Sequence, residues 1–210
     1  MQPQLKDYPL ADLMRSLPGT GASRLASAMQ GSLAVRDVPI YGRPGLMARR
    51  IALAYLDVVG FSRMMWGDED GTLTRWLSIR RNILEPKVKV HGGRLVNAVG
   101  DSVLIEFGNA ADALSWSLDV QHAMEESNAT ERRPLFELRI AVHACHVIVR
   151  GESLYGIGIN LAARLQSHAP PGRVIVSETV YDAVGPIADA MEVGPLLLKN
   201  MPTPVRAYVL

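Results

Sequence analysis

The sequence predicts an α+β fold, in which one antiparallel β-sheet carries helices on one face. Three observations predict it. From about residue 49 onward, short apolar runs of strand length alternate with longer amphipathic segments. Two of the short runs flank a tight Gly-Asp turn, which is typical of a β-hairpin. Apolar residues make up 48% of the 210 residues, which is enough for a core.

The first half of this pattern is a strand, a loop and a helix. Arg50–Asp57 is an apolar run that ends at a carboxylate, and it predicts a buried central strand. Residues 60–70 contain glycine and polar residues and predict a loop. Residues 71–91 have apolar residues at helical spacing, so we expect a helix that Pro86 ends or kinks.

A predicted hairpin and a second helix complete the pattern. The hairpin comprises residues 94–99 and 102–107, with Gly100 and Asp101 in its turn. The remaining expected elements are a helix at 110–127, a β-rich stretch at 135–149, helices at 157–168 and 178–184, and strands at 173–177, 193–198 and 205–209. The order β-α-β-β-α-β is that of a ferredoxin-like sandwich with additional C-terminal strands and helices.

Residues 1–48 differ from the rest of the chain. They contain five prolines and five glycines, which leave room for short helices at about 10–17 and 22–29. Residues 37–44 are expected to form a linker or an extended arm. We therefore divide the chain into an N-terminal extension, 1–48, and one domain, 49–210.

Composition gives no support for several classes of partner. The chain has 22 Lys+Arg against 21 Asp+Glu, so its net charge of +1 gives no argument for binding nucleic acid or an anionic membrane. Cys145 is the only cysteine, which rules out an intrachain disulfide and fits a reducing compartment. Neither an apolar run of membrane-spanning length nor a secretory signal is evident, so we expect a cytoplasmic protein without membrane insertion.

Two carboxylates are candidates for metal binding. Asp57 ends the first strand and Asp101 lies in the hairpin turn, so the two can converge at one sheet edge. Carboxylates without neighbouring His or Cys suit hard cations such as Mg²⁺ or Mn²⁺. A pair of such ions can activate an attacking oxygen and neutralise a triphosphate. The alternative is that both residues are ordinary turn residues.

The loop after Asp57 is a candidate phosphate-binding segment. It lies between a strand and a helix, so its backbone N–H groups can face phosphate oxygens. Its residues are Val58, Val59, Gly60, Phe61 and Ser62.

Four separated segments resemble the catalytic domain of class III adenylyl and guanylyl cyclases, most closely the soluble bacterial type. The segments are RRIALAYLDVVGFSRMM, HGGRLVNAVGDSVLIEF, LYGIGINLAARLQ and LLLKNMPTPVRAYVL. The resemblance covers about Arg49 to Leu210. It implies an enzyme that converts a nucleoside triphosphate, with ATP the best single choice, into a 3′,5′-cyclic monophosphate and pyrophosphate.

The resemblance also implies roles for individual residues. Asp57 and Asp101 match the aspartates that hold two Mg²⁺ or Mn²⁺ ions. Asn160 and Arg164 match the pair that steadies the ribose and the transition state, and Lys199 matches a triphosphate-contacting lysine. In this family one subunit supplies the metal ligands and the other supplies the Asn and Arg, so a homodimer is implied.

The base-reading positions depart from the family pattern. Asn97 stands where adenylyl cyclases carry Lys, and Ser153 where they carry Asp or Thr. Both residues can donate and accept hydrogen bonds, and neither is charged. Two alternatives to an ATP cyclase therefore stay open: a pyrimidine nucleotide cyclase acting on UTP or CTP, and a catalytically silent nucleotide-binding regulator.

Other conspicuous side chains are interpreted as structural. His143 and His146 flank Cys145, but the alternation of a strand gives poor convergence for a zinc site, and we expect a buried strand with an inert thiol. Trp66, Trp76 and Trp116 are expected to pack in the core.

Overall fold

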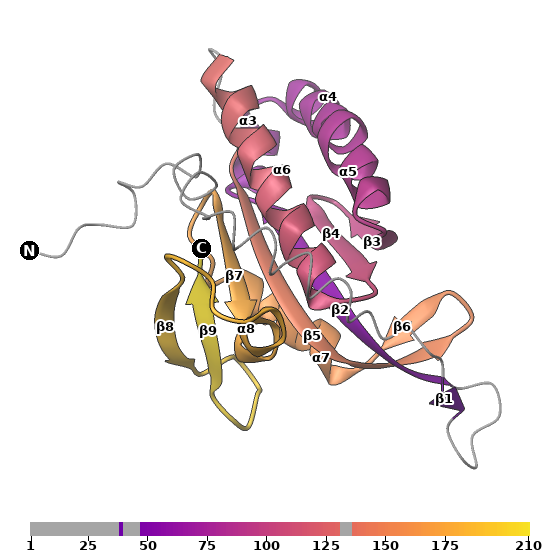
Figure 1. Ribbon diagram of the computed structural model, residues 1–210. Coiled ribbons are helices and arrows are strands. Elements are labelled where there is room, and N and C mark those ends of the chain that lie inside the picture. Colours follow the sequence, from indigo (N-terminus) through magenta and orange to yellow (C-terminus); the bar gives the residue numbers. More distant parts are fainter. Residues whose placement is uncertain (1–37, 40–46, 131–135) are drawn as a thin grey trace, which may run out of the picture.

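The computed structural model describes residues 38–39, 47–130 and 136–210, which form one mixed β-sheet with helices on both faces (Figure 1). Its strands are β1 (Val38–Pro39), β2 (Met47–Val58), β3 (Arg94–Val99), β4 (Ser102–Phe107), β5 (Leu138–Arg150), β6 (Ser153–Tyr155), β7 (Arg173–Ser177), β8 (Met191–Leu196) and β9 (Val205–Val209). The order across the sheet is β3-β4-β2-β5-β7-β9-β8, with β1 paired to β2 and β6 paired to β5. The α+β prediction is confirmed.

Two details of the predicted sheet are wrong. β5 and β7 run parallel, because the chain crosses between them through the helix α7 (Ile157–Gln166). That helix also lies on the opposite face from α6 (Ala110–Thr130), as Figure 1 shows for the two sides of the sheet. The central strand β2 therefore needs apolar residues on both faces, which explains the unbroken run at residues 51–54.

The two faces of β2 are covered by different helices. Ala52, Ala54 and Leu56 pack in the cluster that includes α6. Ile51 and Leu53 pack with Ala162 of α7. All five side chains are at most 3% exposed, so β2 fixes both layers of the fold.

Residues 61–90 form more helix than the sequence predicted. The expected loop at 60–70 contains α3 (Phe61–Gly67), which begins after Gly60, and α4 (Glu69–Ile79), whose first turn is capped by Asp68. The helix continues through a π-helical segment (Arg80–Leu84) into α5 (Glu85–Val90). Pro86 does not end the helix. It stands in the first turn of α5, where a missing N–H is tolerated.

The C-terminal elements agree closely with prediction. Strands β7 and β9 and helix α8 (Glu178–Val184) have the expected bounds, while β8 is displaced by two residues. The short strand β6 was missed. The helices expected at about 10–17 and 22–29 lie outside the described residues, as does the expected arm at 37–44 apart from β1.

The described helices include none that is long and apolar enough to cross a membrane.

Candidate active site

Asp57 and Asp101 meet at one end of the sheet. Asp57 is the penultimate residue of β2, and Asp101 lies in the turn between β3 and β4. The N–H of Val58 donates to Asp101 Oδ2 over 3.4 Å, which joins the two segments. Burial, and next the negative charge of Asp101, raise the pKa of Asp57. Two close carboxylates are thus placed where a bound cation would relieve their repulsion.

A buried tryptophan stabilises the turn that contains Asp101. Trp76 of α4 is 1% exposed, and its indole Nε1 donates to the carbonyl oxygen of Gly100 over 2.9 Å. Gly100 has φ 61°, a left-handed conformation that favours glycine. The prediction that Trp76 and Trp116 pack in the core is confirmed, whereas Trp66 is 95% exposed and that part of the prediction is wrong.

Arg139 is a site residue that the sequence reasoning missed. It lies on β5 directly opposite Asp57, and its positive charge lowers the pKa of that carboxyl against the larger effect of burial. Its Nε is buried and has no hydrogen-bond partner among the described residues. The signal was available: Arg139 is a cation directly before the apolar residues 140–142 of β5, a place where charged side chains are rare unless they have a partner.

Gln166, the last residue of α7, completes this cluster. Its side-chain amide donates to Asp57 Oδ1 and to the carbonyl oxygen of Arg139. Gln166 is 3% exposed. The end of α7 is therefore fixed against the metal-binding candidate of its own chain.

Asn160 and Arg164 lie on the outer side of α7. Asn160 is exposed, and Arg164 Nη1 donates to the carbonyl oxygen of Asn160 over 2.9 Å. The residues of α7 that face the sheet are Gly158, Ala162, Leu165 and Gln166. Since successive residues turn by about 100°, Arg164 points away from the side on which Gln166 reaches Asp57. Within one chain, the two halves of the predicted site face different directions.

Two backbone N–H groups of the candidate phosphate-binding loop donate hydrogen bonds within the chain. Val58 N–H donates to Asp101, and Val59 N–H donates to the carbonyl oxygen of Glu137 over 2.8 Å. Gly60 adopts φ 70° and starts α3, so the amides of Phe61 and Ser62 lie in the first turn of that helix. First-turn amides lack helical partners. The phosphate-binding prediction therefore stays open chiefly for Gly60, Phe61 and Ser62.

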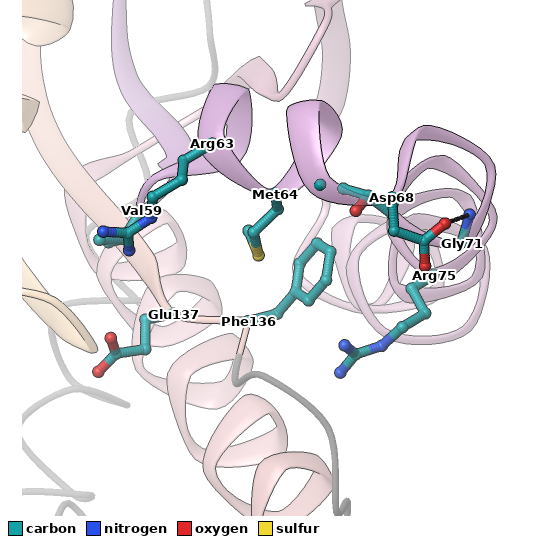
Figure 2. Close-up of a pocket in the computed structure, with 10 residues that line it drawn as sticks. Val59, Arg63, Met64, Asp68, Gly71, Arg75, Phe136 and Glu137 are labelled. Atoms are coloured by element: carbon teal, nitrogen blue, oxygen red, sulfur yellow. Dashed lines mark hydrogen bonds between the residues drawn. The ribbon is translucent and has the colours of Figure 1, made fainter.

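A pocket of about 600 Å³ lies beside this loop, between α3, α4 and the start of β5 (Figure 2). Val59, Met64 and Phe136 contribute apolar atoms, and the guanidinium of Arg75 lies 4.6 Å from the centre of the Phe136 ring. Of the predicted site residues, only Val59 lines it. The pocket is therefore separate from the paired carboxylates.

Asn97 shares a face of the sheet with Asp57. Asn97 pairs with Leu104, which pairs with Tyr55, two residues before Asp57 on β2. Residues two apart on a strand point to the same side, so Asn97 and Asp57 both face the α7 side.

Asn97 is exposed, and so are Ser153, the other predicted base-reading residue, and Lys199, the predicted phosphate contact. Ser153 opens β6, and Lys199 lies in the turn after β8. Asn97, Ser153 and Lys199 come from separate parts of the sheet, and all three are accessible to a ligand or a second chain.

The histidines and the cysteine on β5 do not form a metal site. His143 and Cys145 face α7, whereas His146 is exposed on the other face. Burial lowers the pKa of His143 to about 4 and raises the pKa of the Cys145 thiol to about 11. Both groups are therefore neutral at pH 7, as expected for a structural strand.

The comparisons with known proteins identify the family. Residues 47–210 match the model of the adenylate and guanylate cyclase catalytic domain, and the chain belongs to this family. It is thus related to enzymes that form cyclic nucleotides.

Two sequence relatives and one solved structure illustrate the similarity. A protein of Rhizobium meliloti (strain 1021) named "Putative adenylate cyclase 3" is 34% identical over 79% of this chain and 29% of its own length. An adenylate cyclase of Streptomyces coelicolor is 32% identical over 62% of this chain and 33% of its own length. The crystal structure of an adenylate/guanylate cyclase/hydrolase from Silicibacter pomeroyi has a TM-score of 0.73 and 28% identity, covering 78% of this chain and 97% of that one. The chain spans about a third of the length of the two sequence relatives.

Proposed function

We propose that the chain is a nucleotidyl cyclase that converts ATP to 3′,5′-cyclic AMP and pyrophosphate at sites shared between two copies. The observation that carries the proposal is the placement of Asp57, Asp101 and Arg139. Two carboxylates and a guanidinium without a hydrogen-bond partner at its Nε, among the described residues, converge at the end of the central strand. A bound metal cation would balance the charge of the two carboxylates, and a triphosphate would pair with the guanidinium.

The donor set fits a hard divalent cation. Among the described residues no group of three or more His, Cys, Asp or Glu side chains is placed to hold a metal ion, so Asp57 and Asp101 would be the protein ligands, and substrate and water would fill the other positions. This is the usual way in which Mg²⁺ binds at phosphate-transfer sites. When bound, two such cations would neutralise the phosphate oxygens and acidify the ribose 3′-hydroxyl.

The other residues would then bind and orient the nucleotide. Arg139 would contact the triphosphate beside Asp57, and the first-turn N–H groups of α3 would donate hydrogen bonds to phosphate oxygens. Asn160 and Arg164 would reach the site of a second copy, because they face away from Asp57 in their own chain. Arg164 would stabilise charge that develops on the α-phosphate.

ATP is the proposed substrate because both sequence relatives carry adenylate cyclase in their names. A pyrimidine nucleotide is the second candidate. The exposed, uncharged Asn97 and Ser153 can pair with the amide edge of uracil or cytosine as well as with adenine.

The test is direct turnover of ATP, GTP, CTP and UTP by the purified chain with Mn²⁺. We expect cyclic product with ATP and loss of product in Asp57→Ala and Arg164→Ala. Asp119→Ala is a matched control, because Asp119 pairs with Lys87 and His91 away from the site. Absence of product with every nucleotide would contradict the proposal and favour a silent nucleotide-binding module.

Mixing the two inactive variants tests the shared site. In a symmetric dimer that exchanges subunits freely, half of the dimers carry one variant of each kind and have one intact site, so about a quarter of native activity should return. If subunit exchange is demonstrated and no activity returns, the two residues do not act across an interface.

A further inference from the structure

An ion-pair cluster around a buried glutamate lies on the same face of the sheet as Asn97. Its centre is Glu106 of β4, which is 9% exposed. Arg94 of β3 binds it through two hydrogen bonds, Nε to Oε1 over 2.9 Å and Nη2 to Oε2 over 3.0 Å. Arg49 of β2 adds a contact of 3.3 Å between Nη1 and Oε1. The two-bond geometry fixes the plane of the Arg94 guanidinium.

The other side of this guanidinium reaches a distant segment. Nη1 and Nη2 of Arg94 both lie 3.4 Å from the carbonyl oxygen of Glu152. Glu152 is in the turn between β5 and β6 and immediately precedes Ser153. Arg94 therefore joins β3 to the turn that carries Ser153, over 58 residues of sequence.

Arg94 also starts the strand that carries Asn97. The register of β3 against β4 shifts between Leu95 and Asn97, so a bulge separates Arg94 from Asn97. A bulge re-aims the side chains next to it, and its geometry depends on what holds the strand on either side. Arg94, held by Glu106, is such an anchor.

We propose that Arg94 is a positioning residue for base recognition, which sets the separation and orientation of Asn97 and Ser153. This inference rests on the proposed function, because it assigns a role at the same nucleotide site. The turn at Gly151 and Glu152 is exposed, and β6 pairs with β5 at only three positions. The neighbouring Leu154 packs in the apolar cluster that includes Val96 of β3, but Arg94 makes the hydrogen bond that joins the turn before Ser153 directly to β3.

Arg94 would affect recognition of the base and not of the triphosphate. Asp57 and Arg139 lie on β2 and β5 at the end of the sheet, whereas the hydrogen bonds of Arg94 go to Glu106 and Glu152. Loss of Arg94 should therefore change discrimination between bases while leaving the phosphate contacts intact. A contact that only stabilises the fold would affect all nucleotides equally.

The experiment compares Arg94→Gln and Arg94→Lys with the native chain. Steady-state kcat and KM are measured for ATP, GTP, CTP and UTP, together with inhibition by pyrophosphate, which has no base. We expect Arg94→Gln to change the ratio of kcat/KM between the best and the next nucleotide by about tenfold, mostly through KM. Inhibition by pyrophosphate should stay within about twofold of native, since it reports only the phosphate contacts. Arg94→Lys, which keeps the charge but loses the two-bond geometry, should fall in between.

Arg206→Gln is the matched control. Arg206 is an exposed arginine that bridges Glu178 and Glu192 around β9, so the change removes two ion pairs elsewhere on the molecule. We expect native selectivity in this variant. Unchanged nucleotide ratios in Arg94→Gln would overturn the proposal, as would an equal loss for all nucleotides and for pyrophosphate.

Failure of the proposed function is distinguishable from failure of this inference. If the native chain forms no cyclic product, the same four nucleotides are titrated by calorimetry in the presence of Mg²⁺. A change in relative affinity in Arg94→Gln would still support the positioning role. Equal affinities in the native chain and in Arg94→Gln would overturn it.

Discussion

Substitution of Gly158 tests the packing that places α7 on the sheet. Gly158 is the second residue of α7 and is buried against β5. A Cβ atom at this position would lie 2.3 Å from Cys145 Sγ and 2.7 Å from Cys145 Cβ. Cys145 cannot withdraw easily, because its strand is paired with β2 along most of its length. We therefore expect Gly158→Ala to push α7 away from the sheet.

The expected magnitude follows from two opposing effects. Overpacking of a core costs about 1–3 kcal/mol, and the higher helix propensity of Ala returns at most about 1 kcal/mol. We expect a net loss of about 2 kcal/mol in the free energy of unfolding, or a Tm lower by roughly 5 °C for a domain of this size. Since α7 carries Asn160 and Arg164, turnover should fall as well.

The assay is urea unfolding of four variants in a double-mutant cycle. Cys145→Gly removes both clashing atoms, so adding it to Gly158→Ala should recover stability relative to the sum of the single changes, with a coupling energy of about 1–3 kcal/mol. Gly67→Ala is the matched control, because a Cβ there has no neighbour within 4 Å. Equal effects at Gly158 and Gly67, or a coupling energy near zero, would refute the packing argument.

Two further predictions concern the candidate site. Asp57→Asn should leave the metal-free chain at least as stable as native, because burial and Asp101 disfavour the charge at this position. The same change should abolish the rise in Tm that Mn²⁺ causes in the native chain. Urea unfolding and thermal melts with and without Mn²⁺ measure both effects, and a native response to Mn²⁺ would contradict the prediction. The double change Asn97→Lys and Ser153→Asp should raise the preference for ATP over the other nucleotides by about tenfold or more, measured as a ratio of kcat/KM. If the ratio does not move, these positions do not contact the base.

Much of the fold could be predicted because local signals agree with the tertiary structure. The hairpin around Gly100 and Asp101 has apolar runs and a turn signal in the right order, and both strands have the predicted bounds. The side on which α7 packs could not be predicted, because β2 is apolar on both faces and gives no preference. The first turn of α3 was missed because Gly60 suggested a loop, whereas its left-handed conformation starts the helix.

The candidate site was predictable only in part, because some of its residues become informative only through pairings between distant strands. Asp57 and Asp101 are recognisable from their places at the ends of strands. Arg139 becomes informative only through the register of β5 against β2, which places it opposite Asp57. The link from Arg94 to Glu152 depends on the path of a hairpin in space. Long-range pairings of this kind leave no periodic signal in the sequence.

His143 is a residue whose structural role has a testable consequence for pH dependence. Its side chain is 7% exposed, and its Nδ1 lies 2.9 Å from Ser177 Oγ. Burial lowers its pKa from 6.5 to about 4. The unfolded chain therefore takes up a proton at higher pH than the folded chain, so stability is fully present above about pH 6.5 and is lost as the pH falls toward 4.

The size of this effect can be isolated with a variant. A shift from 6.5 to about 4 corresponds to about 2 kcal/mol of lost stability at pH 5 relative to pH 7, at 1.36 kcal/mol per unit. Asp57, whose pKa is raised, acts in the opposite direction, but it is present in both proteins when native is compared with His143→Asn. The difference in unfolding free energy between the two should therefore shrink by about 2 kcal/mol from pH 7 to pH 5. A difference for His143→Asn that stays constant with pH would mean that folding does not shift the pKa of His143, and it would contradict this prediction.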